Sequence, residues 1–200
     1  MKIMRACWQV FCLSILLFFG IVRLVAASEP LELVKLAAEK AILVLKDPQL
    51  QAKEKKKERL DRLKEIANPI FDYEEMAKRT LGPHWRRRTP AEQQEFVKLF
   101  RDFLEKIYSD RVDLYAGQKV IFSRESLDND FAQVDSVFVT PKGEEIAVVY
   151  RLRRADGKWR VYDAILENIS IVNNYRSQFD RVITKSSYEE LKRMLKEKAG

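Results

Sequence analysis

The sequence predicts an α+β fold, with a curved antiparallel sheet of four strands packed against N-terminal and C-terminal helices. Apolar residues recur every three to four positions between Glu29 and Tyr115, as on one face of a helix. They then recur at every second position between Lys119 and Leu166, as in strands with one buried face. The helical period returns after Asn168. Helices that precede a run of strands indicate an α+β rather than an alternating α/β architecture.

The first 27 residues are expected to be a secretory signal peptide that is removed on export. Basic residues precede an apolar run from Ala6 to Val22, and small residues at positions 25–27 form the expected cleavage site. A membrane anchor is the alternative, since the run is nearly long enough to span a bilayer. Arg23 interrupts the run and small residues follow at once, which favours cleavage before Ser28.

Residues 28–200 are expected to form a single domain, because 173 residues (200 minus 27) are a normal size for one compact core. Both cysteines, Cys7 and Cys12, lie in the expected signal peptide, so the exported chain has no disulfide. Losing the three basic residues of the signal peptide takes the net charge from +7 to +4 (7 minus 3). Such a mild basic excess argues against nucleic-acid binding, which usually concentrates basic residues on one surface.

The helical part is expected to begin with two helices between Glu29 and Asn68, with Pro30 and Pro48 marking the ends of the first. A further helix is expected to stop at Leu81-Gly82-Pro83, where glycine and proline indicate a helix end followed by a turn.

A long helix is expected to open at Thr89, its N-cap, with Pro90 at the first helical position, and to reach Tyr115. Its apolar residues form two neighbouring stripes, so the helix must be covered on more than one side. A central place in a filled core explains this pattern, and so does a place in the wall of a ligand cavity. One stripe comprises Phe96, Phe100, Phe103 and Ile107, and the other comprises Val97, Leu104 and Tyr108.

Four strands are expected after Gly117, joined as an antiparallel meander by short hairpin turns. Alternation places Val148 and Tyr150 on one face of the third strand, and Val161 and Ile165 on one face of the fourth. The pattern does not fix the register of every strand, which leaves open which face lines a cavity. The predicted strands are residues 119–126, 131–140, 145–154 and 159–166, with turns at 128–130, 141–143 and 155–157.

Residues typical of catalysis or metal binding are scarce in the exported chain. Its one histidine, His84, is interpreted as a turn residue beside Trp85, and without cysteine a zinc site of Cys and His ligands is excluded. Asp163 is the other candidate acid or base, but we interpret it as a carboxylate bonded to a neighbouring Tyr, Arg or backbone N–H. We expect no metal and no cofactor. What remains is apolar surface, which forms either an ordinary core or the walls of a cavity.

Two segments of the chain resemble the MlaC family of periplasmic phospholipid-binding proteins, which are auxiliary components of an ABC transport system also known from toluene tolerance. They are "FDYEEMAKRTLGPHWRRRTPAEQQEFVKLFRDFLEKIY" and "YRLRRADGKWRVYDAILENISIVNNYRSQF". The most specific parts are Phe71 through Trp85, the long helix after Thr89-Pro90, and Trp159-x-x-Tyr162-Asp163, which leads to Glu167, Ser170 and the helix of Tyr175-Arg176. Asn168 departs from the family pattern, which usually has glycine there, but asparagine also tolerates a left-handed backbone. The bend after the last strand is therefore expected to survive.

The resemblance implies an NTF2-like half-cone whose pocket takes acyl chains, with the segment from Ile169 to Ile183 folded across an opening of the cone. It implies a soluble periplasmic carrier that shuttles phospholipid between an outer-membrane lipoprotein complex and an inner-membrane MCE-domain ABC transport complex. Such shuttling would maintain the lipid asymmetry of the outer membrane. The phospholipid would be cargo rather than a cofactor, no enzymatic activity is implied, and we expect a monomer.

The pocket walls are predicted from the shared faces of the long helix and of the third and fourth strands. Two alternatives stay open: a small-molecule enzyme of the NTF2-like class, which would need a polar pair inside the cone, and an interaction module whose cone is filled by side chains. The predicted lipid-binding residues are Phe100, Phe103, Ile107, Val148, Tyr150, Val161 and Ile165.

Overall fold

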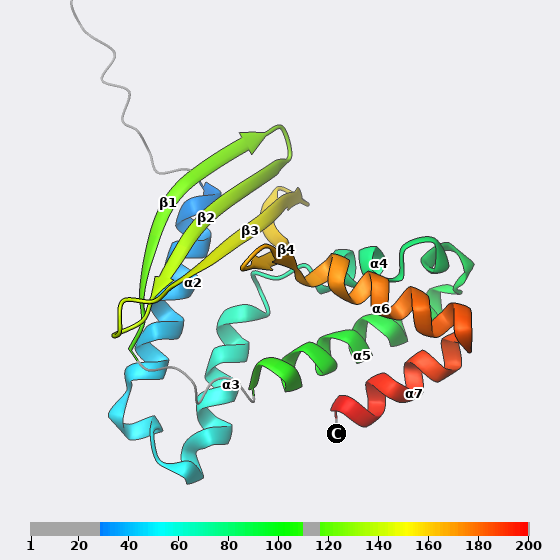
Figure 1. Cartoon of the computed structure of the whole chain (residues 1–200), viewed down its shortest axis with the longest axis horizontal. Coiled ribbons are helices and arrows are strands. Elements are labelled where there is room, and N and C mark those ends of the chain that lie inside the picture. The colour runs from blue at the N-terminus through cyan, green and yellow to red at the C-terminus, as the bar shows by residue number, and fades with distance from the viewer. Residues whose placement is uncertain (1–28, 110–116, 200) are drawn as a thin grey trace, which may run out of the picture.

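A computed structural model of the chain describes residues 29–109 and 117–199. Figure 1 shows an open sheet beside a layer of helices, with the first N-terminal helix along the sheet and the second next to the first. The α+β class predicted from the sequence is confirmed, whereas the NTF2-like half-cone stays a prediction. The expected signal peptide, and the end of the long helix up to Tyr115, lie outside the described residues.

The N-terminal segment forms the two predicted helices, joined by two short 3-10 turns. The first helix ends before Pro48, and the Asp47 carboxylate accepts a hydrogen bond from the backbone N–H of Gln49 (2.9 Å). The buried Arg59 side chain donates to the backbone carbonyl of Leu50 (2.8 Å), which ties the second helix to the turn. These elements are α2 (Glu29–Lys46), η1 (Pro48–Leu50), η2 (Lys53–Lys55) and α3 (Lys56–Ala67).

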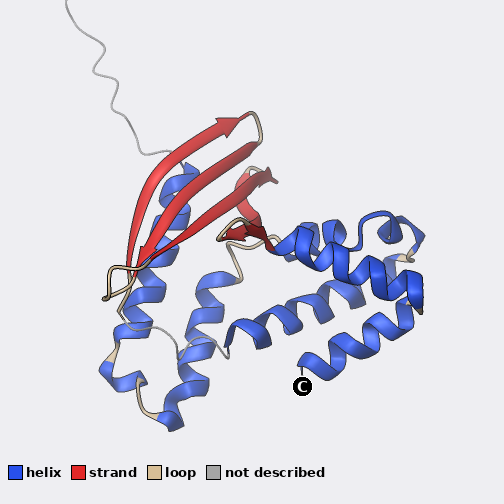
Figure 2. Cartoon of the chain, viewed as in Figure 1, coloured by secondary structure: helices blue, strands red, loops and turns tan. Residues whose placement is uncertain are grey.

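Four further helices pack together at the other end of the molecule (Figure 2). Their core is aromatic, and Phe96 and Phe100 meet the ring of Phe179 edge-on at centroid distances of 6.0 Å. The predicted stop at Gly82 is confirmed, since its φ of 54° ends the preceding helix. The elements are α4 (Tyr73–Leu81), η3 (Gly82–Arg87), α5 (Pro90–Ser109), α6 (Ile171–Lys185) and α7 (Tyr188–Ala199).

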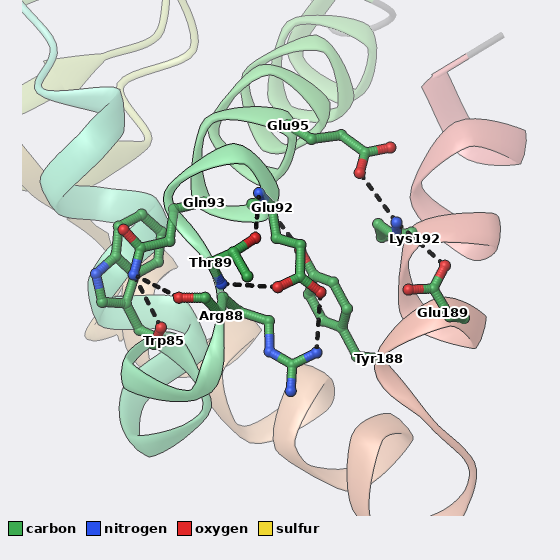
Figure 3. A network of polar contacts seen from close by, with 9 residues as sticks. All are labelled: Trp85, Arg88, Thr89, Glu92, Gln93, Glu95, Tyr188, Glu189 and Lys192. Carbon is green, nitrogen blue, oxygen red and sulfur yellow. Dashed lines mark hydrogen bonds and ion pairs between the residues drawn. The ribbon is translucent and has the colours of Figure 1, made fainter.

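The start of α5 carries the predicted N-cap, which forms a reciprocal capping box (Figure 3). The Thr89 backbone N–H donates to the Glu92 carboxylate (2.7 Å), and the Glu92 backbone N–H donates to the Thr89 hydroxyl (3.3 Å). The same turn is tied to α7, because the Tyr188 hydroxyl donates to the backbone carbonyl of Glu92 (3.2 Å). Lys192 of α7 pairs with Glu95 of α5 at 2.9 Å. Cap and ion pair together fix α5 against α7.

The sheet is antiparallel, and its strands follow one another in chain order. It is open, because its first and last strands are not hydrogen-bonded to each other. A fifth strand of two residues corrects the prediction of four strands. Two bulges interrupt the pairing: Ser123 is the extra residue of the first strand and Tyr162 that of the fourth. The strands are β1 (Lys119–Asp128), β2 (Phe131–Val139), β3 (Glu145–Ala155), β4 (Lys158–Leu166) and β5 (Ile169–Ser170).

One face of the sheet, here called the inner face, packs against α2. Val134, Leu152 and Val161 from three neighbouring strands meet Val34 of α2 there, and each is less than a tenth exposed. This sheet core is separate from the helical core built around α5 and α6. The molecule therefore has two apolar cores, one on the sheet and one among the helices.

The chain turns from β4 into α6 through Glu167 and Asn168, which both adopt positive φ (46° and 68°). The left-handed conformation expected of Asn168 is confirmed. Asp163, which is 2% exposed, accepts hydrogen bonds from the Ser170 hydroxyl (2.7 Å) and the Val172 backbone N–H (3.1 Å). Its interpretation as a structural carboxylate is thus confirmed, and it clamps the start of α6 to the sheet.

The course of α6 differs from the expectation that it would fold across an opening of the sheet. Figure 1 shows α6 running away from β4, alongside α4 and α5. Tyr175 and Phe179 face the helical core, where the Tyr175 ring lies 5.1 Å from that of Phe103. Because α4 and the aromatic side chains of α5 cover this face, most of its apolar residues are core.

Candidate functional site

A cavity of about 560 Å³ lies between the inner face of the sheet and the helices. Its walls come from the end of α2, from α3, α4 and α5, from the strands β2, β3 and β4, and from the first residue of α6. It lies where the sheet core and the helical core meet, since both Tyr150 and Phe71 contact both cores. The cavity is thus the space that two separately packed bodies leave between them.

The sheet wall of the cavity consists of alternate residues of three strands. Val148 is paired with Leu166, and Tyr150 with Ala164, so these four side chains share the inner face. Phe138 and Ile146 extend this wall toward the other end of β3. Burial raises the pKa of the Tyr150 hydroxyl to about 12, so that it stays neutral. The wall is apolar apart from this uncharged phenol.

The helical wall of the cavity comes from three helices. Leu60 and Leu63 of α3 face it, together with Met76 of α4. α5 contributes Leu104 and Tyr108, which form the second of its two apolar stripes. A ligand in the cavity would therefore contact branched and aromatic side chains on both sides.

Two of the seven predicted lipid-binding residues, Val148 and Tyr150, lie on the cavity wall. Phe100 and Phe103 are instead 0% and 2% exposed within the helical core, and Ile107 packs against the same core. Both stripes of α5 are apolar in sequence, and α6 covers the one that contains Phe100 and Phe103. Lipid contact itself stays a prediction for the two residues on the wall.

The two predicted residues of β4 lie off the cavity for different reasons. Val161 shares the inner face but belongs to the sheet core under α2, where it is 1% exposed. Ile165 lies on the opposite face, because the bulge at Tyr162 shifts the alternation by one residue. Ala164 and Leu166 take its place on the wall. The α3 stripe of Leu60, Leu63 and Ala67 was visible as a helical repeat, but nothing in the sequence placed it opposite the sheet.

Polar groups line the cavity at one corner, where α3, α4 and α5 meet. Lys64 of α3 pairs with Glu105 of α5 at 2.9 Å, and both line the cavity. Burial raises the pKa of the Tyr73 hydroxyl to about 12, with the charge of Glu105 adding to the effect. The corner therefore offers an ion pair and a neutral phenol beside apolar walls.

The candidate catalytic residues lie away from this cavity. His84 contacts Asp180 at 2.9 Å on the far side of the helical layer, and the Asp163 carboxylate is taken up by the start of α6. Among the described residues there is no group of three His, Cys, Asp or Glu side chains that could hold a metal ion. Within the same ranges, no helix combines the length and apolarity needed to cross a membrane.

The fold and the cavity define an α+β protein that encloses an apolar space between an open sheet and a helical layer. Its family follows from comparison with known proteins. The MlaC protein family matches residues 35–197, and the chain therefore belongs to the MlaC family.

Individual relatives agree with this assignment. The chain is 22% identical over 172 residues to the intermembrane phospholipid transport system binding protein MlaC of Haemophilus influenzae, covering 84% of this chain and 80% of that protein. It is 26% identical over 157 residues to the toluene tolerance protein ttg2D of Pseudomonas putida, covering 78% and 73%. Its fold is similar to that of the phospholipid-binding protein from Ralstonia solanacearum, solved with a phospholipid, at a TM-score of 0.75 and 24% identity. That alignment covers 86% of this chain and 97% of the other.

Proposed function

We propose that the protein is a periplasmic phospholipid carrier that holds acyl chains in the cavity between its sheet and its helices. The observation that carries the proposal is the cavity itself, whose volume of about 560 Å³ is lined almost entirely by apolar side chains. Ligand pockets of small molecules typically span roughly 300–1,000 Å³. The names of the relatives point to the same cargo, and the cavity argues against an interaction module with a filled core.

The energetics of such a carrier are a matter of matching two apolar environments. A phospholipid with two chains has on the order of 30 methylene groups, and at about 0.8 kcal/mol each their transfer into water costs roughly 20 kcal/mol or more. An apolar cavity removes most of that cost. Because a bilayer is equally apolar, the difference between membrane and protein is small, so partner complexes can direct loading and release.

The proposal includes partners on both membranes. They are an outer-membrane lipoprotein complex and an inner-membrane MCE-domain ABC transport complex, and the transport would maintain outer-membrane lipid asymmetry. Support comes from the family and from the name of the Haemophilus influenzae relative, which is a binding protein of an intermembrane phospholipid transport system. The exported chain would act as a monomer. It would act without catalysis, since the polar groups of the cavity are an ion pair and neutral phenols rather than an acid and base poised for proton transfer.

The test is to purify the exported protein without detergent and to analyse it by native mass spectrometry and lipid extraction. We expect phospholipid to be bound and to exchange with labelled vesicles. A protein that carries no extractable lipid and takes none up from vesicles would contradict the proposal.

A further inference from the structure

At the polar corner, the charged lining residues Lys64 and Glu105 have a third charged neighbour, Arg101, which lies beside Glu105 but is not part of the cavity lining. Lys64 Nζ lies 2.9 Å from Glu105 Oε2, and Arg101 Nε lies 3.8 Å from Glu105 Oε1. Glu105 is 17% exposed, whereas Lys64 and Arg101 are each 41% exposed. One carboxylate on the cavity wall is therefore approached by two cations from two helices.

The charges of this corner do not cancel. Arg101 also approaches Asp102 at 3.8 Å, but Asp102 pairs more closely with Lys98, at 3.0 Å. Among the described residues, the ion pairs of this corner link three cations, Lys64, Lys98 and Arg101, to two carboxylates, Asp102 and Glu105, which leaves one positive charge in excess (3 minus 2). The excess lies beside an otherwise apolar space, where a ligand with one anionic end and apolar chains finds both of its requirements.

Tyr73 adds a hydrogen-bond donor to the same corner. Its side chain lines the cavity, and burial together with the nearby Glu105 charge raises the pKa of its hydroxyl to about 12. The phenol therefore keeps its proton at physiological pH. A protonated phenol can donate its hydrogen bond to a neutral or a negatively charged acceptor, such as a phosphate oxygen.

We propose that the corner formed by Lys64 and Tyr73, with Arg101 adding its charge from beside Glu105, binds the phosphate of the lipid, and that the phosphate competes with Glu105 for Lys64. This rests on the proposed function and assigns the headgroup end of the cargo. A carboxylate and a phosphate offer an ammonium group the same kind of charge-assisted bond. Exchange of one for the other costs Lys64 no net desolvation. The acyl chains then extend from the corner along the sheet wall.

A purely structural ion pair that ties α3 to α5 is the competing explanation, and the two make opposite demands on Glu105. A structural pair is lost equally when either partner is changed. If the phosphate instead competes with Glu105 for Lys64, removing the lysine charge weakens lipid binding. Removing the Glu105 charge then frees Lys64 and strengthens lipid binding.

The experiment compares phosphatidylglycerol with diacylglycerol of the same chains, which lacks the phosphate. The protein is first stripped of lipid, and binding of each is measured by native mass spectrometry. We expect Lys64→Gln to weaken phosphatidylglycerol binding roughly tenfold, the size of one charge-assisted hydrogen bond, and to leave diacylglycerol binding within twofold. Glu105→Gln should strengthen the binding of phosphatidylglycerol but not that of diacylglycerol. Lys64→Arg, which keeps the positive charge, should bind phosphatidylglycerol as well as the unaltered protein does.

The pair Lys192 and Glu95 supplies matched controls, because it is also a lysine–glutamate pair of 2.9 Å between α5 and another helix, but it lies off the cavity. Lys192→Gln and Glu95→Gln should change neither lipid's binding. Urea midpoints of all variants separate loss of folding from loss of binding.

Several outcomes would overturn the inference. They are equal effects of Lys64→Gln on both lipids, or a loss rather than a gain of phosphatidylglycerol binding in Glu105→Gln. Inorganic phosphate added at constant ionic strength should leave phosphatidylglycerol binding unchanged. If it abolishes the preference over diacylglycerol, the corner is a general anion site. Binding of neither lipid by the unaltered protein would instead contradict the proposed function.

Discussion

Asp163 connects the sheet to the helical layer through a single buried side chain. Its carboxylate accepts the Ser170 hydroxyl and the Val172 backbone N–H, while Arg151 approaches it at 3.5 Å from a position that is 39% exposed. The ion pair is therefore screened by solvent, and the two hydrogen bonds supply most of the stabilisation. Both anchor the first turn of α6.

Asp163→Ala is expected to destabilise the fold by about 3 kcal/mol, because it leaves one buried and one partly buried donor without their charged acceptor. Asp163→Asn retains one acceptor and should cost less. Urea unfolding measures both. Asp180 is the control, since its carboxylate is 61% exposed, and Asp180→Ala should stay within about 0.5 kcal/mol. Similar losses for Asp163→Ala and Asp180→Ala would show that the clamp contributes little.

The limits of the sequence are clearest at Ile165. Period-two alternation predicts that Ile165 shares a face with Val161, and it would do so in a regular strand. The extra residue Tyr162 reverses the alternation after Val161, so that Leu166 faces the cavity instead. A bulge is a property of the pairing between β3 and β4, and no residue of β4 announces it. The role of Asp163, by contrast, was predictable from the rule that buried carboxylates are bonded.

At the scale of elements, β3 separates cavity from surface within two adjacent residues. Val148 lies on the inner face and lines the cavity, and Val149 lies on the other face, opposite Ile165. Val161 shares the inner face of the neighbouring strand but belongs to the sheet core. These three valines make a test of where the cavity ends.

Val148→Trp is expected to lower the bound lipid by half or more, because the larger ring occupies space meant for an acyl chain. The urea midpoint should change little when the variant and the unaltered protein are both compared after stripping of lipid. Val149→Trp should leave lipid content unchanged. Val161→Trp should destabilise the fold by about 1–3 kcal/mol, the usual cost of overpacking a core. Lipid content per folded molecule is measured by extraction. If Val148→Trp unfolds early while its lipid content is unchanged, Val148 is core and the cavity is misplaced.

Most elements were predictable because each has its own period. The two N-terminal helices, the cap at Thr89 and the four long strands follow from local patterns that the structure confirms. The two-residue strand β5, the course of α6 and the choice between the stripes of α5 were not predictable. Each depends on which element covers which, and covering is decided by tertiary packing rather than by spacing along the chain.

At the scale of the whole molecule, the cavity lies between two apolar cores that are joined beside it by Phe71 and Tyr150. One is built on the sheet and α2, and the other on α5 and its neighbouring helices. A bound lipid would contact both cores at once, since residues of both cores line the cavity. The bound lipid would then fill the space between the two cores as side chains do elsewhere. When the lipid is removed, the apolar side chains of the cavity wall lose these van der Waals contacts.

Removing the lipid is therefore expected to lower the thermal midpoint, and reloading to restore it. A ligand that binds only the folded state stabilises it by about 2.7 kcal/mol when its free concentration exceeds Kd a hundredfold. Differential scanning calorimetry of stripped, reloaded and untreated protein measures the effect. Val148→Trp should show a smaller difference between the stripped and reloaded forms. Identical midpoints for the three preparations of the unaltered protein would contradict the coupling of cargo to stability.

The bulge at Ser123 bears on how copies of this molecule behave in a crowded compartment. β1 is an outer strand of ten residues, and such a strand presents a row of backbone N–H and C=O groups on which another chain can pair. The extra residue breaks the even spacing of that row near its middle, and Arg124 adds a charge beside it. The irregular spacing and the charge make it harder for the edge strand of another copy to pair with β1. We expect the open sheet that forms one wall of the cavity to resist stacking into filaments through this edge.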